Sequence, residues 1–224
     1  MTDSRLQDQV FLREEISKYS KRAYDRGLIR GTGGNLSTRT PTNEMVLITP
    51  TDISLVDVKP EENILLNLQG EIIESPLGLM PSKETSFHLK VYRLCSDVRG
   101  VVHLHPPYAT AYANQGTPLP MVTVSARAKL EQVPNIGCAP PGSEELCEAN
   151  IGCAPPGSEE LCELVARGME SFPDARAFLM KEHGILTLGE DLRTAYYLAE
   201  LVEETARIAF IEGSIRVKQG EHGG

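Results

Sequence analysis

The sequence predicts an α/β fold of three layers (α/β/α), with helices on both faces of a mixed central sheet. Short apolar runs typical of strands alternate irregularly with segments whose apolar residues recur every 3.6 positions, as on one face of a helix. No point along the 224 residues shows the change of composition that marks a linker. We therefore expect one domain over residues 1–224, long enough for a single substantial core.

The composition is that of a soluble globular protein, with 41% apolar and 24% charged residues. A formal net charge of −9 argues against binding to nucleic acid or to anionic membranes, because both need a basic surface. No apolar stretch approaches the roughly eighteen residues of a membrane span, and the N-terminus lacks the apolar core of a signal peptide. We therefore expect a cytoplasmic location.

The first half of the chain predicts one helix followed by strands. The helix should run from about Leu6 to Arg26 and end at Gly27, because its apolar residues keep helical spacing. A tight glycine-rich loop follows at 31–35. Four strands come next, the last two forming a hairpin around Gln69-Gly70: 36–39, 45–49, 63–68 and 71–73.

In the second half, Ser82 is a good N-cap residue for a second helix, and the apolar run 100–105 predicts a strand that Pro106-Pro107 stops. The last helix is the clearest, with apolar residues at helical spacing from Leu192 onward and Asp191 as its cap. The elements expected between them are a helix at 107–114, a strand at 121–124, a helix from Ser158 to about Glu170, and strands at 177–180 and 185–188.

Residues 135–148 recur without change at 150–163, so a tandem repeat with a period of fifteen residues occupies 135–164. Four of the five cysteines lie in the two copies, at spacings that match no zinc-knuckle pattern, and a cytosolic setting disfavours disulfides. Two identical copies are too few for a solenoid. They indicate a recent tandem duplication or an error in the recorded chain, and the sequence leaves open which copy takes its place in the fold.

Three histidines are candidate metal ligands. His103 and His105 lie two apart on a predicted strand, so their side chains project from the same side of it. His183, between two predicted strands, supplies a third imidazole, and a catalytic zinc typically takes three protein ligands. The alternative is that each is an ordinary hydrogen-bonded histidine. His222 is no candidate, because we expect the tail at 213–224 to be disordered.

Glu84 is the candidate carboxylate beside this metal, in the first turn of the helix expected at Ser82. A carboxylate that coordinates an ion and also swings off it can carry a proton. His88 lies one helical turn further on, as a fourth ligand or as a partner that orients Glu84. Alone, Glu84 would be a helix N-terminal acid that the helix dipole stabilises. Together with the three histidines it favours a metal site.

Two segments could bind an anion. Backbone N–H groups at 33–35 and 82–83 can cradle one, and Thr32, Ser82 and Lys83 add side-chain donors. The motif Gly-Thr-Gly-Gly-Asn is weak by itself, since it lacks the Lys-Ser/Thr of a P-loop and precedes a predicted strand. A plain turn is the alternative.

These motifs together resemble the class II aldolase/adducin family over roughly residues 8–212. The matching stretches are Gly31–Ser37, Ile48–Thr51, Pro81–Thr85, Val102–Pro106 and Glu182–Gly184. The family includes fuculose-phosphate aldolase and ribulose-5-phosphate 4-epimerase. The resemblance implies a largely antiparallel sheet within the three-layer fold, and a homotetramer with active sites between subunits. It also implies a small phosphorylated sugar as substrate.

The resemblance assigns a role to each candidate residue. It implies that His103, His105 and His183 hold Zn²⁺, with Co²⁺ or Mn²⁺ also accepted by such a ligand set, and that Glu84 is the acid/base carboxylate. It places five residues at phosphate-binding positions: Gly34, Asn35, Thr51, Ser82 and Lys83.

The reaction implied is reversible cleavage of a ketose 1-phosphate to dihydroxyacetone phosphate and an aldehyde, through an enediolate that the metal stabilises. Three alternatives stay open. One is a decarboxylase of a phosphorylated 3-oxo sugar acid, which Lys83 favours, because its charge suits a carboxylate. The second is an epimerase, although epimerases of the family tend to carry aspartate at the position of Glu84. The third is an adducin-like interaction module, although such modules have usually lost the ligands.

The chain departs from fuculose-phosphate aldolases near the expected substrate. Asp52 replaces a glycine and Lys83 replaces a serine. The two tyrosines of those aldolases have no counterpart, since Val124 stands at the first position and no tyrosine follows Tyr197. A proton donor to the aldehyde oxygen would then be another group, for which the candidates are Tyr108 and Tyr112.

Overall fold

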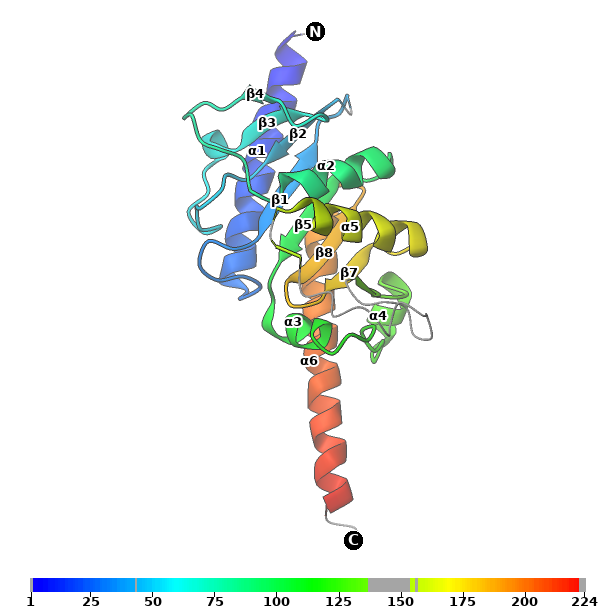
Figure 1. Ribbon diagram of the computed structural model, residues 1–224. Helices are drawn as coiled ribbons and strands as arrows, with labels where there is room; N and C mark the ends of the chain where they lie inside the picture. Colours follow the sequence, from blue (N-terminus) through cyan, green and yellow to red (C-terminus); the bar gives the residue numbers. More distant parts are fainter. Residues whose placement is uncertain (1, 43, 137–153, 156, 222–224) are drawn as a thin grey trace.

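Eight strands of the described residues join in one sheet, in the order β4-β3-β2-β1-β5-β8-β7-β6. The structure is a computed structural model that describes residues 2–42, 44–136, 154–155 and 157–221 (Figure 1). Neighbouring strands are antiparallel throughout, except for the parallel pair β6 and β7. The strands are β1 (Asn35–Arg39), β2 (Met45–Ile48), β3 (Ile64–Asn67), β4 (Ile72–Glu74), β5 (Gly100–Leu104), β6 (Asn135–Ile136), β7 (Ala177–Met180) and β8 (Gly184–Gly189).

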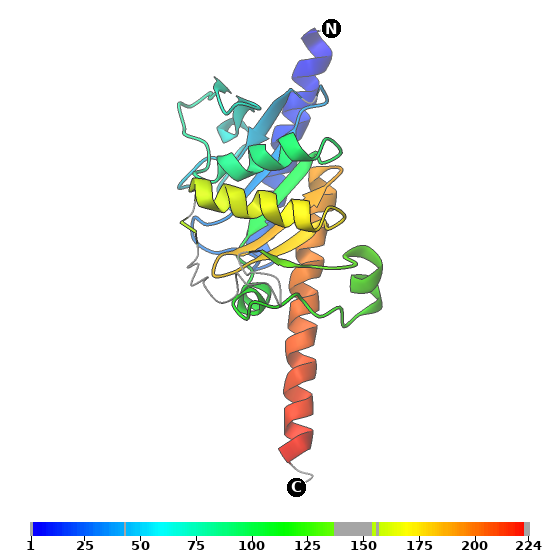
Figure 2. The ribbon, with the colours of Figure 1, turned by 45° about the vertical axis from the view of Figure 1, so that its right-hand side comes forward.

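Helices cover both faces of this sheet (Figures 1 and 2). One core cluster joins the sheet to α1 (Thr2–Asp25), α3 (Pro107–Ala113), α4 (Val124–Lys129) and α6 (Leu192–Glu221). The other joins it to α2 (Thr85–Leu94) and α5 (Glu159–Ser171). A short 3-10 helix, η1 (Pro60–Glu62), connects β2 and β3. The predicted three-layer α/β/α fold with a mixed, largely antiparallel sheet is therefore confirmed.

Strand β5 contributes side chains to both hydrophobic core clusters. Val102 and Leu104 point into the α1/α6 core, whereas Val101 points into the α2/α5 core. Because side chains alternate along a strand, His103 belongs to the same face as Val101. Its ring accordingly meets Phe87 of α2 edge-on, with 5.5 Å between the ring centroids.

The second helix begins later than predicted. The backbone N–H of Ser82 donates to Thr49 O, and Pro50 pairs with Pro81, so this segment runs on as extended chain beside the end of β2. Helix α2 starts only at Thr85, with Glu84 as its N-cap residue. The expected start of the helix at Ser82 was wrong.

Two other predicted elements differ. The apolar run 121–124 is no strand, because Thr123 caps a helix there, its hydroxyl accepting a hydrogen bond from the Ala126 N–H at 3.1 Å. Residues 213–221 are helical as the end of α6, in place of the disordered tail expected over 213–224; residues 222–224, with His222, lie outside the described part. No described helix is both long and apolar enough to cross a membrane.

Both copies of the repeat contribute to the fold. Strand β6 comes from the first copy and pairs with β7, whereas Ser158 of the second copy caps α5 by accepting from the Leu161 N–H at 3.2 Å. Gly157, at φ +78°, lies against the Lys83 carbonyl, where a Cβ atom would come within 2.4 Å of the oxygen. Residues 137–153 lie outside the described part. Which copy takes the place of a single copy in the fold therefore stays open, although the start of the first and the end of the second both lie in described elements.

Candidate metal and catalytic site

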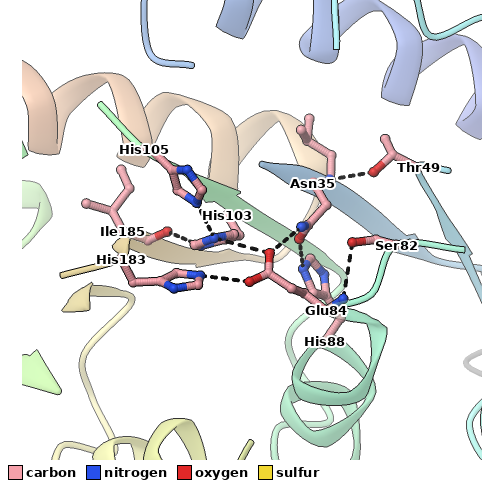
Figure 3. Close-up of polar contacts among 10 residues, drawn as sticks. Asn35, Thr49, Ser82, Glu84, His88, His103, His105, His183 and Ile185 are labelled. Carbon is pink, nitrogen blue, oxygen red and sulfur yellow. Dashed lines mark hydrogen bonds and ion pairs between the residues drawn. The ribbon is translucent and has the colours of Figure 1, made fainter. Parts of the chain in front are cut away.

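The structure brings His103, His105 and His183 together at the ends of two paired strands. Leu104 at the end of β5 pairs with Ile185 of β8, which places the residue after β5 beside the residue before β8. One ring nitrogen from each histidine lies within 4.8 Å of the others, and the Nε2 atoms of His103 and His105 are 2.8 Å apart. Figure 3 shows the three rings converging.

Glycines allow this close approach. A Cβ atom on Gly184 would lie 2.7 Å from the Cδ2 atom of His105, and one on Gly33 would lie 3.1 Å from its Nδ1 atom. Gly34, at φ +73°, packs on the carbonyl oxygen of His103, 3.0 Å from where a Cβ would stand. The glycine-rich loop therefore closes over the histidine strand, a role that needs no bound anion.

Glu84 reaches two of the three imidazoles. Its Oε1 atom lies 2.7 Å from His183 Nε2, and its Oε2 atom lies 3.3 Å from His103 Nε2 (Figure 3). Burial alone would raise the pKa of the Glu84 carboxyl, but the imidazoles of His103 and His183 bring it below its usual range. The side chain is therefore a carboxylate, buried beside the histidine cluster.

The hydrogen bonds of this cluster leave ligand nitrogens facing one another. His103 Nδ1 donates to the carbonyl oxygen of Ile185 at 2.8 Å, because a carbonyl only accepts. Burial lowers the pKa of His103 well below its ordinary value and that of His105 to about 4, so both rings are neutral. The bare Nε2 atom of His103 then faces the Glu84 carboxylate. Converging nitrogen and carboxylate donors of this kind fit a divalent cation, with Ile185 O orienting one ligand ring.

Thr51, Ser82 and Lys83, three of the positions expected to bind phosphate, lie on two segments that contact each other next to Glu84. The Ser82 hydroxyl accepts the Glu84 N–H at 3.3 Å, and the Thr51 N–H donates to Met80 O at 3.0 Å. The ammonium group of Lys83 lies 3.2 Å from the carboxylate of Asp52, and both side chains are largely exposed. These contacts hold the two segments side by side, and phosphate binding there stays a prediction.

A model of the class II aldolase and adducin N-terminal domain matches residues 14–210. The chain belongs to this family. A 5-deoxy-D-ribulose 1-phosphate aldolase of Bacillus thuringiensis is 34% identical over 207 residues, which cover 91% of this chain and 86% of that protein. A 3-oxo-tetronate 4-phosphate decarboxylase of Haemophilus influenzae is 31% identical over 206 residues, covering 88% and 86%. A solved L-fuculose 1-phosphate aldolase superposes with a TM-score of 0.78 at 28% identity, covering 91% of this chain and 87% of that one.

In this class II aldolase-like chain, the side chain of Asn35 directly contacts the carboxylate of Glu84. Its amide nitrogen lies 2.6 Å from Glu84 Oε2, and its carbonyl oxygen lies 2.5 Å from His88 Nε2. Asn35 is only 3% exposed, so both polar ends of its side chain are used within the protein. Of the two roles considered for His88, its contacts match that of a partner orienting Glu84, acting through Asn35.

Tyr108 and Tyr112 lie on α3, in the layer that contains α6. The ring of Tyr108 packs against Phe210 with 5.6 Å between centroids, and both tyrosines pack against the α1/α6 core. Within the described part of the chain, these packing contacts lie away from the histidine cluster. Glu203 of α6 accepts the backbone N–H groups of Tyr108 and Ala109, which anchors the start of α3 just after His105. Proton donation by either tyrosine stays a prediction.

Sequence reasoning missed Ser37 and Tyr92. Ser37 Oγ lies 2.7 Å from His88 Nδ1 and 2.8 Å from the hydroxyl of Tyr92. A signal was present in the sequence, because Asn35 and Ser37 are two apart on one strand face, and Glu84, His88 and Tyr92 recur every four residues. Only the packing of α2 on β1 reveals that the two sets meet.

Proposed function

We propose that this protein is a metal-dependent lyase of the class II aldolase type. The proposed reaction is the reversible cleavage of a small ketose 1-phosphate, similar to fuculose phosphate, to dihydroxyacetone phosphate and an aldehyde. The contact of a buried carboxylate, Glu84, with two of three clustered imidazoles carries this proposal. The 34% identity to a protein named 5-deoxy-D-ribulose 1-phosphate aldolase supports the same substrate class.

His103, His105 and His183 would hold the ion, which we propose to be Zn²⁺, with Co²⁺ and Mn²⁺ as the other metals that suit these ligands. When bound, it supplies a Lewis acid that draws electron density from the substrate carbonyl, worth several kcal/mol. The orientation of His103 by Ile185 O is already set in the protein, so this ligand needs no rearrangement.

Glu84 would carry the proton at the reacting carbon. In condensation the Glu84 carboxylate would remove a proton from the carbon that attacks, that carbon would form the new bond to the aldehyde carbon, and the aldehyde oxygen would take up a proton from another group of the site. Cleavage would run these steps in reverse: the hydroxyl proton returns to that group, the carbon–carbon bond breaks, and the protonated Glu84 returns its proton to the carbon left with the electron pair. Its ionised state and its position within hydrogen-bond reach of the histidine cluster suit a general base. Tyr108 or Tyr112 stays our prediction for the group that serves the aldehyde oxygen.

A second candidate is decarboxylation of a phosphorylated 3-oxo sugar acid. Lys83 directly precedes Glu84, and its exposed ammonium group contacts only an equally exposed carboxylate, Asp52, in the ion pairs of the described residues. An exposed ion pair is weak, at about 0–1 kcal/mol, so Lys83 can exchange Asp52 for a substrate carboxylate. The relative named 3-oxo-tetronate 4-phosphate decarboxylase favours this alternative.

One experiment separates these reactions. Purified protein is assayed with a panel of ketose 1-phosphates, with phosphorylated 3-oxo acids and with ribulose 5-phosphate, and release of dihydroxyacetone phosphate is compared with release of carbon dioxide. An aldolase gives the first product, a decarboxylase the second, and an epimerase gives neither but interconverts ribulose 5-phosphate and xylulose 5-phosphate. Lys83→Ser should reduce a decarboxylase activity more than an aldolase activity. Turnover of none of these substrates by metal-loaded protein would contradict the proposal.

We further propose a homotetramer in the cytoplasm, with active sites between subunits, as the family resemblance implies. Phe210, Ile211 and Ile215 near the end of α6 are 46–55% exposed, an apolar surface that a neighbouring subunit could cover. Light scattering coupled to size-exclusion chromatography tests it: a tetramer has four times the mass of the 24.6 kDa chain.

A further inference from the structure

A second polar cluster lies behind Glu84, between β1 and α2. Four contacts join five side chains in a row: Glu84 to Asn35 at 2.6 Å, Asn35 to His88 at 2.5 Å, His88 to Ser37 at 2.7 Å, and Ser37 to Tyr92 at 2.8 Å. All five are buried, none more than 6% exposed. We refer to these five side chains, in this order, as the row. We propose that it points every hydrogen-bond donor toward Glu84 and thereby positions the carboxylate for proton transfer.

The arrangement follows from two periods in the sequence. Strand β1 presents Asn35 and Ser37 on one face, two residues apart. Helix α2 and its N-cap present Glu84, His88 and Tyr92 at intervals of four, one turn apart. The row alternates between helix and strand at each step, so the packing of α2 against β1 builds it.

The direction of the first bonds follows by elimination. The NH₂ group of Asn35 lies 2.6 Å from Glu84 Oε2 and donates to it, which sets the orientation of the amide. Its carbonyl oxygen then faces His88, and because that oxygen only accepts, His88 must carry a hydrogen on Nε2. The contact of the Asn35 amide with Glu84 therefore determines which ring nitrogen of His88 carries the hydrogen.

The remaining bonds follow from the neutral state of His88. The ring is fully buried and stacks on Phe87 at 4.7 Å between centroids, and burial lowers its pKa to about 3. A neutral ring with its hydrogen on Nε2 has a bare Nδ1, so Ser37 donates to it. The Ser37 oxygen then accepts from the Tyr92 hydroxyl.

A buried cation lies at the far end of the row. Arg39, the next residue of β1 on this face, is 4% exposed; it donates to the Tyr92 carbonyl and lies over the Tyr92 ring, 5.0 Å from its centroid. The row thus runs from a positive charge to the negative charge of Glu84, with each donor aimed at the negative end. Hydrogen bonds aligned in this way strengthen one another in a low-dielectric interior.

The proposal rests on the proposed role of Glu84 as proton carrier. Asn35 contacts Oε2 and His183 contacts Oε1, so both carboxylate oxygens are held and Glu84 keeps one orientation beside the histidine cluster. Ser37, His88 and Tyr92 touch neither the histidine cluster nor the expected substrate positions in the contacts described. They are positioning residues.

The position of the ring hydrogen of His88 tests the direction of the hydrogen bonds in the row. This test does not depend on enzyme activity. Solid-state ¹⁵N NMR of histidine-labelled, metal-loaded protein reports the state of each ring nitrogen, and His88→Gln assigns the signal. We expect a neutral ring with its hydrogen on Nε2. A hydrogen on Nδ1, or on both nitrogens, would overturn the proposal.

Kinetics test whether the row positions Glu84 or merely packs α2. Ser37→Ala should lower kcat about tenfold and Tyr92→Phe about threefold, with KM and metal content unchanged, as expected from the loss of one hydrogen bond. Tyr196→Phe is the matched control, because that fully buried phenol donates to Glu200 at 2.6 Å, far from this row. It should lose stability and keep kcat.

The outcomes are distinguishable. If Ser37→Ala and Tyr92→Phe lose stability but keep kcat, as Tyr196→Phe is expected to do, the row is only a packing device and the positioning role is wrong. If the wild type turns over no substrate, the proposed function fails, and the His88 ring proton still decides the direction of the row.

Discussion

His88 and the cluster of His103, His105 and His183 lie on opposite sides of the Glu84 carboxylate (Figure 3), and their ring nitrogens are satisfied in different ways. His88 has one neutral partner for each nitrogen, Asn35 for Nε2 and Ser37 for Nδ1. The rings of His103, His105 and His183 instead turn their Nε2 atoms toward one another or toward Glu84. A buried histidine with two ordinary partners orients its neighbours, whereas three imidazoles that converge on a carboxylate are suited to a cation.

The difference arises from where each ring stands. His88 lies in the middle of the contact between α2 and β1, where polar groups of a strand and a helix interleave. The three converging rings stand at the ends of β5 and β8, where the sheet stops and glycines leave room. The first environment is closed by protein atoms on both ring nitrogens, whereas the second includes the partly exposed ring of His105.

The largest effect should follow from removing one of the converging rings. His105→Ala should lower kcat/KM by about 10³-fold or more, because it removes a metal ligand and with it several kcal/mol of charge stabilisation. Steady-state assays with the substrate that the panel described above identifies measure this loss. Activity within tenfold of wild type would contradict a metal held by these three residues.

Glu84→Gln should come next, with kcat lowered about 10²–10⁴-fold, the range of general acid–base catalysis. The substitution keeps the size of the side chain and removes its charge and its proton-carrying ability. Metal content, measured on the same preparations, serves as the control and should stay near that of wild type. A variant that retains both metal and full kcat would show that another group carries the proton.

The converging site also depends on its glycines. Gly34→Ala should destabilise the protein by about 1–3 kcal/mol more than Gly31→Ala, because only the first adds an overpacking clash. Both glycines have positive φ, +73° and +64°, so the conformational strain is shared, but a Cβ on Gly31 meets nothing within 4 Å. Denaturant unfolding of the two variants measures the difference, and equal losses would contradict the close packing of the loop on His103.

A separate effect is a pH dependence of stability that belongs to His88. Burial lowers its pKa from 6.5 to about 3, so between these values the unfolded chain binds more protons than the folded one. Stability should therefore fall as the pH falls below 6.5, and it should fall less steeply in His88→Gln. Unfolding free energies at several pH values test this; identical slopes in both proteins would contradict a neutral His88.

The sequence predicted those features of the histidine cluster that depend on the spacing of residues within one strand or one helix. The spacing of His103 and His105 placed both on one side of β5, and the motif around His183 placed the third ring between β7 and β8. The three-layer fold followed from the order of apolar runs. Glu84 was found as well, although it is the N-cap of α2 and not part of its first turn, because the Pro50–Pro81 pairing delays the helix.

What the sequence did not reveal depends on contacts between distant segments. The roles of Ser37 and Tyr92 require α2 to lie on β1, which no local pattern specifies. Strand β6 has only two residues, too short for a periodic signal, and its partner β7 is about forty residues away. The apolar run 121–124 has the composition of a strand, but in the structure Thr123 caps helix α4 within this run.

Metal analysis of the purified protein tests the central claim most directly. Mass spectrometry of metal content should find about one divalent ion per chain in the wild type, as for a catalytic site of three histidines. The ion should be lost in His105→Ala and retained in His88→Gln, the matched variant on the other side of Glu84. A wild type that binds Zn²⁺, Co²⁺ and Mn²⁺ no better than His105→Ala would contradict the account.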